Sequence, residues 1–179
     1  FLRDLKRLAN VLKERGIEAG DIVGIYLPMI PELVVAMLAC ARIGAPHNVV
    51  FGGFSPEAVR ERMEFSEAKA LITADASRRK GRAAPMKAEL DPELEGLRGV
   101  ETIIVVRNTG TAAPMTEGRD LWYHEVVEAA SEDCPAEPLD SEHPLYVLYT
   151  SGSTAKPKGV LHTTGGYLTG VQTTTRYVF

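Results

Sequence analysis

A short stretch rich in hydroxyls, glycine and lysine is the part of the sequence best suited to bind a ligand. Between Thr150 and Gly159 the chain carries four hydroxyl side chains, two glycines and two lysines. Glycine lets backbone N–H groups approach an anion closely, hydroxyls donate further hydrogen bonds, and lysines neutralise charge. A polyphosphate matches such a cradle best, because its oxygens are dense and multiply charged.

Two named alternatives fail for this stretch, and a plain one stays open. No Gly-Lys-Ser/Thr follows Gly152 at the spacing of a Walker A loop. The stretch also lacks the G-x-S-x-G pattern, so Ser151 and Ser153 carry no hydrolase signature. Composition alone is equally consistent with a solvated Ser/Gly/Lys loop of no special function.

A second candidate is a cluster of cations between residues 78 and 82. Arg78, Arg79, Lys80 and Arg82 lie close together in a chain whose net charge is −4. A solvated charged turn is the plain interpretation. A nucleic-acid site is disfavoured, because no aromatic side chains interleave the cluster and the overall charge is negative. A phosphate site is the sharper hypothesis, since arginine can bind phosphate through two parallel hydrogen bonds.

Composition disfavours several other functions. No apolar run approaches the roughly 20 residues that cross a bilayer, and the first residues lack the apolar stretch of a signal peptide. Cys40 and Cys134 have no CxxC spacing, and the four histidines show no HxxxH or HExxH pattern. We therefore expect a cytoplasmic protein with no metal site of its own, no membrane association and no nucleic-acid partner.

Short apolar runs alternate with amphipathic segments along the chain. Ser55, Pro56 and an acid at position 57 predict a helix start. The alternation predicts an α/β fold with a parallel-rich sheet covered by helices, in which ligands bind at the carboxyl ends of strands. Trp122 and Tyr123 are interpreted as packing residues on a helix. The expected strands are 22–27, 45–50, 69–73, 102–106 and 145–149, and the expected helices are 5–12, 31–42, 55–68 and 121–130.

The order of residues in the candidate phosphate-binding stretch identifies a family. The string from Tyr149 to Val160 resembles the phosphate-binding loop of the adenylate-forming superfamily, T-S-G-[ST]-T-G-x-P-K-G. The continuation from Leu161 to Leu168 resembles the acetyl-CoA synthetase branch, and so do residues 49–57 and 73–75. The resemblance covers essentially the whole chain and is most specific at 46–57 and 145–170.

This resemblance implies an enzyme with two half-reactions. Acetate attacks the α-phosphate of ATP, which is bound with Mg²⁺, and coenzyme A then displaces AMP from acetyl-AMP. The segment implied to clamp the β- and γ-phosphates comprises Thr150, Ser151, Gly152, Ser153, Thr154, Lys156, Lys158 and Gly159. The segments implied to contact coenzyme A comprise Phe51, Gly52, Gly53, Arg79, Lys80, Gly81 and Arg82.

The resemblance also implies that the chain is a piece of a larger polypeptide. Residues 1–179 would form an incomplete segment of the N-terminal AMP-binding domain. This segment would divide into a first α/β portion (1–130), an acidic surface connector (131–144) and the phosphate-binding strand, loop and helix (145–179). The family places its catalytic lysine and acyl pocket after this segment, so we expect no catalytic residue here. Partners would be acetate, ATP, coenzyme A and the rest of the polypeptide.

Three alternatives to an acetate-specific ligase remain. The parent enzyme could act on propionate or another short acid, because the residues that choose the acyl group lie outside the chain. The segment could be a catalytically inactive module that binds nucleotide or coenzyme A. A P-loop phosphotransferase is disfavoured by the missing Gly-Lys-Ser/Thr. One departure from the family pattern is Ala155, which stands where the family has glycine, and we hypothesise that it weakens ATP handling.

Overall fold

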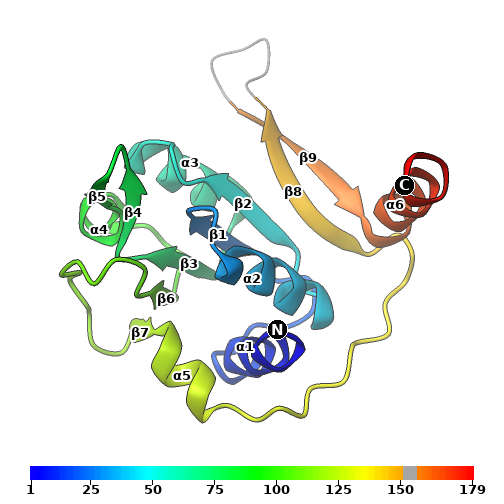
Figure 1. Cartoon of the computed structure of the whole chain (residues 1–179), viewed down its shortest axis with the longest axis horizontal. Helices are drawn as coiled ribbons and strands as arrows, with labels where there is room; N and C mark the ends of the chain where they lie inside the picture. The colour runs from blue at the N-terminus through cyan, green and yellow to red at the C-terminus, as the bar shows by residue number, and fades with distance from the viewer. Residues whose placement is uncertain (151–156) are drawn as a thin grey trace.

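Within residues 1–150 and 157–179, which the computed structural model describes, seven strands form one sheet. The strands are β1 (Val23–Leu27), β2 (His47–Phe51), β3 (Ala70–Ala74), β6 (Thr102–Val106), β7 (Asp120–Trp122), β8 (Pro144–Thr150) and β9 (Lys158–Thr163). Their order across the sheet is β7-β6-β3-β1-β2-β8-β9. Neighbours from β7 to β8 are parallel, and β9 pairs antiparallel with β8 (Figure 1).

The centre of the sheet is covered on both faces. Every residue of β1, β3 and β6 is buried, which matches their predominantly apolar sequences. A strand that is buried on both sides cannot tolerate the alternating polar residues of a half-exposed strand. The predicted α/β fold with a parallel-rich, helix-covered sheet is therefore confirmed.

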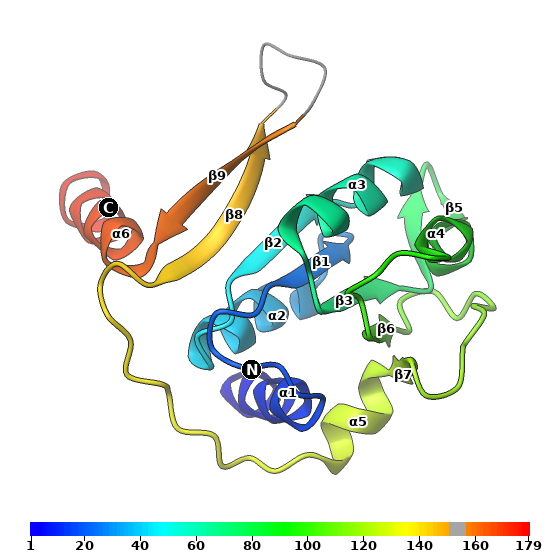
Figure 2. The same ribbon diagram turned by 180° about the vertical axis from the view of Figure 1, so that it is seen from behind.

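Helices α1 (Leu2–Glu14), α2 (Pro31–Arg42) and α5 (Tyr123–Ala129) pack together, and α3 (Pro56–Ser66) packs with α4 (Lys87–Leu94). The chain moves from β1 to β2 in one direction and then back across β1 to β3. Because crossovers between parallel strands are right-handed, this reversal places α2 and α3 on opposite faces. Figures 1 and 2 show the two helices on opposite sides of the sheet.

The start of α3 follows the predicted signals. Ser55 Oγ accepts a hydrogen bond from the Ala58 N–H at 3.4 Å, and Pro56 occupies the first helical turn. Arg60, which also lies on α3, is half-buried. Its guanidinium donates to the backbone oxygens of Glu93 and Glu95 and so joins α3 to the end of α4.

Two sequence-based expectations about local structure are wrong. The basic loop is a hairpin of β4 (Ala76–Arg79) and β5 (Arg82–Pro85), joined by a two-residue turn. The helix expected over 121–130 begins only at Tyr123, because Leu121 and Trp122 belong to β7 and pair with β6. Trp122 is half-buried, and the Arg107 guanidinium lies 4.5 Å from its ring centroid, so its interpretation as a packing residue holds on a strand.

A buried charge network joins α4 to the edge of the sheet. Lys87 is fully buried, and its Nζ lies 2.6 Å from Asp91 Oδ1 and 2.8 Å from Asp120 Oδ2. Arg119 forms ion pairs with the same two carboxylates at 2.9 and 2.6 Å. Burial alone would raise the pKa of Asp120, but hydrogen bonds from Arg119 and Lys87 lower it overall. Two cations and two carboxylates thus compensate one another.

The β8–β9 hairpin and helix α6 (Thr164–Val178) form a separate projection (Figure 1). The hairpin joins the main sheet through two residue pairs, His47 with Tyr146 and Asn48 with Val147. No residue of α6 is buried within the described part of the chain. The sequence did not predict β9, since a helix was expected directly after the phosphate-binding stretch.

Candidate functional site

The two segments expected to contact coenzyme A lie side by side at the carboxyl ends of β2 and β3. Phe51 is the exposed last residue of β2, and Gly52 and Gly53 form the turn that follows it. A Cβ atom built on Gly53 would lie 2.5 Å from Arg79 Nη2 and 2.5 Å from the Phe51 ring. The Arg79 guanidinium therefore packs directly against the glycine turn, in a space that only a residue without a side chain leaves open.

Gly52 meets a different neighbour. A Cβ atom there would lie 2.9 Å from the backbone oxygen of Leu27, at the end of β1, and 3.3 Å from Pro28 Cα. The turn thus rests on the backbone of the adjacent strand. Because backbone atoms at a strand end cannot move aside as a side chain can, this contact fixes the position of the turn relative to the end of β1.

The basic hairpin presents its cations to solvent. Lys80 and Gly81 both have positive φ, at 48° and 75°, which is the backbone of a type I′ hairpin turn. The side chains of Arg78, Arg79, Lys80 and Arg82 are exposed, and none forms an ion pair with a carboxylate of residues 1–150 or 157–179. These cations are available to an anionic ligand.

Asp75 anchors the base of this hairpin. Its carboxylate is fully buried and accepts hydrogen bonds from the backbone N–H groups of Ala76 at 2.6 Å, Asn108 at 2.9 Å and Gly110 at 2.7 Å. The Asp75 backbone oxygen accepts from the Met86 N–H at the other end of the hairpin. One side chain therefore ties the hairpin to the loop after β6. In the sequence, residue 75 only marks the resemblance, and no local pattern indicated this role.

Tyr26, near the end of β1, supports the same site from below. Its hydroxyl donates to the backbone oxygen of Phe54 at 2.9 Å and so holds the chain just after the glycine turn. Burial raises the pKa of the phenol, and nearby Glu89 adds to this effect while Arg79 opposes it. The hydroxyl stays protonated at neutral pH and remains a donor.

The candidate phosphate-binding segment starts and ends on paired strands. Thr150 closes β8 and pairs with Lys158 in β9, and Tyr149 pairs with Gly159. Thr150 Oγ1 lies 3.5 Å from the Lys158 backbone oxygen, and all three of Thr150, Lys158 and Gly159 are exposed. The other expected phosphate ligands lie outside the described residues; they are Ser151, Gly152, Ser153, Thr154 and Lys156. Ala155 lies outside them as well.

Arg62 lies between the two candidate segments and was not singled out by the sequence. It projects from α3 and is 8% exposed. Its guanidinium carbon lies 4.5 Å from the ring centroid of Phe54 and 5.7 Å from that of Tyr149. Phe54 follows the glycine turn, and Tyr149 precedes Thr150. The aromatic partners are far apart in sequence, so no local pattern could have indicated this cluster.

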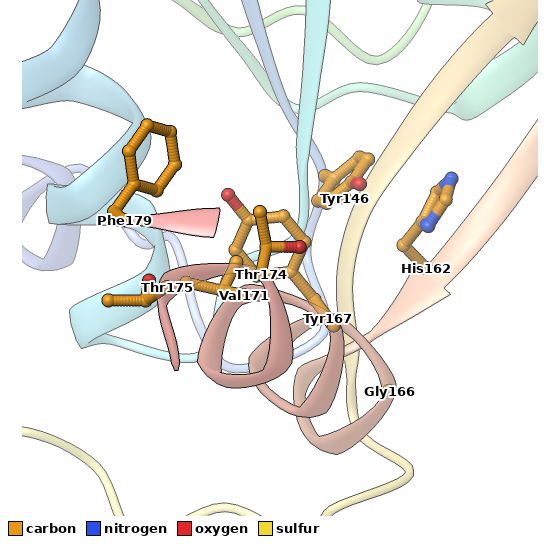
Figure 3. A pocket seen from close by; sticks show the side chains of 9 residues that line it. Tyr146, His162, Gly166, Tyr167, Val171, Thr174, Thr175 and Phe179 are labelled. Atoms are coloured by element: carbon orange, nitrogen blue, oxygen red, sulfur yellow. The ribbon is translucent and has the colours of Figure 1, made fainter. Parts of the chain in front are cut away.

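A shallow cavity of about 470 Å³ lies between the β8–β9 hairpin and α6 (Figure 3). Tyr146 and His162 line it from the hairpin, and their rings stack with centroids 4.4 Å apart. Tyr167 meets Tyr146 edge to face from α6. His47 stacks on Tyr146 from β2, and burial lowers its pKa to about 4. The burial of His47 and the stacking of both imidazoles on Tyr146 indicate packing rather than acid–base chemistry.

Comparison with known proteins decides the family. The profile of the AMP-binding enzyme family matches residues 1–178. The chain belongs to this family. The acetyl-coenzyme A synthetase of Rubrobacter xylanophilus is 58% identical over 176 residues, and acetyl-coenzyme A synthetase 2 of Pseudomonas aeruginosa is 58% identical over 173 residues. The acetyl-coenzyme A synthetase of Halorhodospira halophila is 57% identical over 173 residues.

These alignments cover 98%, 97% and 97% of the chain, in that order, and the chain spans 27% of the length of each of the three relatives. Membership of the AMP-binding enzyme family confirms the family inferred from the Thr150–Gly159 stretch. In the described part of the chain, no helix is both long and apolar enough to cross a bilayer. The same residues contain no cluster of three or more histidine, cysteine or acidic side chains suited to a metal.

Proposed function

We propose that this chain is a segment of an AMP-forming acetate–CoA ligase, which activates acetate with ATP and transfers the acetyl group to coenzyme A. Relatives named acetyl-coenzyme A synthetase match nearly the whole chain at 57–58% identity. The observation that carries the proposal is the packing of Arg79 against Gly53, because it joins an exposed cationic hairpin to a glycine turn at the carboxyl edge of the sheet.

In this proposal the basic hairpin and the glycine turn hold the nucleotide end of coenzyme A. The 3′-phosphate would be bound by Arg79 and Arg82, with Lys80 and Gly81 shaping the turn between them. Arginine suits this task because its planar fork donates two hydrogen bonds to one phosphate. Phe51, Gly52 and Gly53 would leave a flat surface on which the adenine can lie.

The β- and γ-phosphates of ATP would be held by the segment from Thr150 to Gly159. The hydrogen-bond donors and the lysines of this segment would stabilise the negative charge that develops on the departing pyrophosphate. Mg²⁺ would enter with ATP as part of the substrate complex. The contributing residues would be Thr150, Ser151, Gly152, Ser153, Thr154, Lys156, Lys158 and Gly159.

The segment would belong to the N-terminal AMP-binding domain of a cytoplasmic enzyme. Residues 1–130 would supply the coenzyme A contacts, 131–144 a surface connector, and 145–179 the phosphate-binding part. The acyl pocket and the catalytic lysine would come from the remainder of the polypeptide. Small molecules, rather than nucleic acid or membrane, would be its partners.

Acid-dependent ATP–pyrophosphate exchange tests the proposal on the full-length enzyme that contains this chain. We expect exchange with acetate to exceed exchange with propionate and butyrate at equal concentration. Faster exchange with propionate would favour the alternative of another short-chain ligase. Absence of exchange with every short carboxylic acid would refute the proposal.

A second candidate function is a module that binds coenzyme A without catalysis. The observation that favours it is the set of exposed hairpin cations that form no ion pair within residues 1–150 and 157–179. Calorimetric titration of the chain with coenzyme A, and with dephospho-coenzyme A as the control, tests it. Binding that depends on the 3′-phosphate supports the assigned site, and equal binding of both ligands argues against it.

A further inference from the structure

Arg62 is a buried cation with no acidic partner among the described residues. It projects from the middle of α3, and its Nη1 donates to the Ala58 backbone oxygen one turn earlier at 2.6 Å. None of the ion pairs formed by residues 1–150 and 157–179 includes it. Burying an unpaired charge is costly, so a residue retained in this state needs compensation from other contacts.

The compensation comes from two aromatic rings on different segments. The guanidinium carbon lies 4.5 Å from the centroid of Phe54 and 5.7 Å from that of Tyr149. A flat, weakly hydrated guanidinium can face aromatic rings in this way, whereas a lysine ammonium is compact and strongly hydrated. We call Arg62, Phe54 and Tyr149 the arginine clamp.

Each ring of the arginine clamp is fixed to one of the two candidate binding segments. The Phe54 N–H donates to the Phe51 oxygen at 2.9 Å, which closes the glycine turn, and the two rings meet edge to face. Tyr149 pairs with Gly159 across the hairpin and directly precedes Thr150. A displacement of either ring therefore moves one end of a ligand-binding segment.

Arg62 itself is held rigidly. Its backbone oxygen accepts hydrogen bonds from Asn48 Nδ2 at 3.2 Å and from Ser66 Oγ at 2.7 Å. Val59 and Met63, on the same helix, are fully buried in the core. The guanidinium thus extends from a fixed point of the domain, as a residue that sets the separation of two loops must do.

We propose that Arg62 is a positioning residue that holds the coenzyme A turn and the start of the ATP-phosphate segment at a fixed separation. The proposal rests on the function proposed above and extends it, because it makes one side chain serve both half-reactions. Its charge, which has no acidic partner among the described residues, also adds positive potential beside the two segments proposed to bind phosphates.

The full-length enzyme tests this role through Arg62→Met, which keeps an unbranched apolar side chain and removes the charged, planar guanidinium. We expect the KM values for ATP and for coenzyme A each to rise about fivefold to tenfold, the range set by loss of a partly buried cation–π contact. Arg62→Lys, which restores charge without the planar face, should recover part of the loss.

Two further variants separate positioning from general stability. Tyr149→Leu should raise the KM for ATP more than that for coenzyme A, and Phe54→Leu should do the reverse. A purely structural role would not produce this split. Arg60→Met is the matched control, because Arg60 lies on the same helix and binds only backbone oxygens of the Glu93–Glu95 region among the described residues.

Unchanged KM values in Arg62→Met, or changes of the same size in Arg60→Met, overturn the role of Arg62. If Arg62→Met does not fold, the two aromatic variants decide, and equal effects on both KM values overturn the proposal. A wild-type enzyme without acid-dependent exchange would overturn the proposed function together with this inference. An active wild type with an unaltered Arg62→Met variant would overturn the inference alone.

Discussion

Alanine substitutions at Gly52 and Gly53, the two adjacent glycines of the turn proposed to contact coenzyme A, should have different consequences. At Gly53 the new methyl group would meet Arg79 Nη2 and the Phe51 ring, each at 2.5 Å. Both neighbours are exposed side chains that can turn away. At Gly52 the methyl group would meet the backbone of Leu27 at 2.9 Å and Pro28 Cα at 3.3 Å, neither of which can yield easily.

The magnitudes follow from these neighbours. Overpacking against fixed atoms costs about 1–3 kcal/mol, so Gly52→Ala should lower the Tm by roughly 3–10 °C in a chain of this length. Gly53→Ala should change the free energy of unfolding by less than about 1 kcal/mol, because the clash is relieved by side-chain rotation. It displaces Arg79, however, and loss of one charge-assisted hydrogen bond weakens coenzyme A binding by roughly 10- to 100-fold.

Thermal unfolding and calorimetric titration with coenzyme A measure the two effects on the same samples. Arg79→Ala is the reference for complete loss of the arginine contact, and dephospho-coenzyme A is the reference ligand without the 3′-phosphate. Wild-type affinity in Gly53→Ala, together with weak binding in Arg79→Ala, would refute the coupling of turn and hairpin. If Gly53→Ala lowered the Tm as much as Gly52→Ala, the distinction between fixed backbone neighbours and movable side-chain neighbours would be refuted.

Three further predictions concern buried polar groups. Asp75→Asn places an amide N–H against backbone N–H donors, so the free energy of unfolding measured in urea should fall by about 2 kcal/mol. Because the hairpin then loses part of its anchor, coenzyme A binding should weaken as well. Lys87→Met leaves the buried Asp120 and the partly buried Asp91 with Arg119 as their one cation among the described residues, and should lower the free energy of unfolding by about 3–5 kcal/mol. The double variant Lys87→Met/Asp120→Leu should recover part of this loss when both are compared by urea titration. The pKa of His47 is lowered to about 4, so the unfolded chain takes up its proton first as the pH falls below about 6.5. The contribution of His47 to the free energy of unfolding should therefore fall by about 3 kcal/mol between pH 6.5 and pH 4. In denaturant titrations at pH 7 and pH 5, His47→Phe should show a smaller difference in stability between the two pH values than the wild type.

The sheet was predictable because strands that are buried on both faces have predominantly apolar sequences. The apolar runs of β1, β3 and β6 have no polar alternation, and this indicates parallel strands under helices. The glycine turn and the arginines both follow strands at their carboxyl ends, and those ends share one edge of a parallel sheet, which accounts for their proximity.

The remaining elements depend on contacts that no local pattern records. The strands of the basic hairpin carry arginine and alanine rather than alternating apolar residues, and the Lys80–Gly81 dipeptide was the one available turn signal. Strand β9 is exposed along most of its length and is held by pairing with β8. Arg62 is indistinguishable in sequence from the other charges of α3 until Phe54 and Tyr149 are brought to it.

The attachment of the β8–β9 hairpin has a consequence for the order of folding. Strands β1, β2, β3 and β6 follow one another along the first part of the chain, whereas the hairpin docks through contacts such as His143 Nε2 with the Gly44 oxygen, 99 positions apart. Long-range closure is slow, and the two-pair junction between β2 and β8 offers little to hold an early encounter. The central strands should therefore acquire protection against hydrogen exchange first. The β8–β9 hairpin, which flanks the proposed ATP-phosphate segment, should acquire it last.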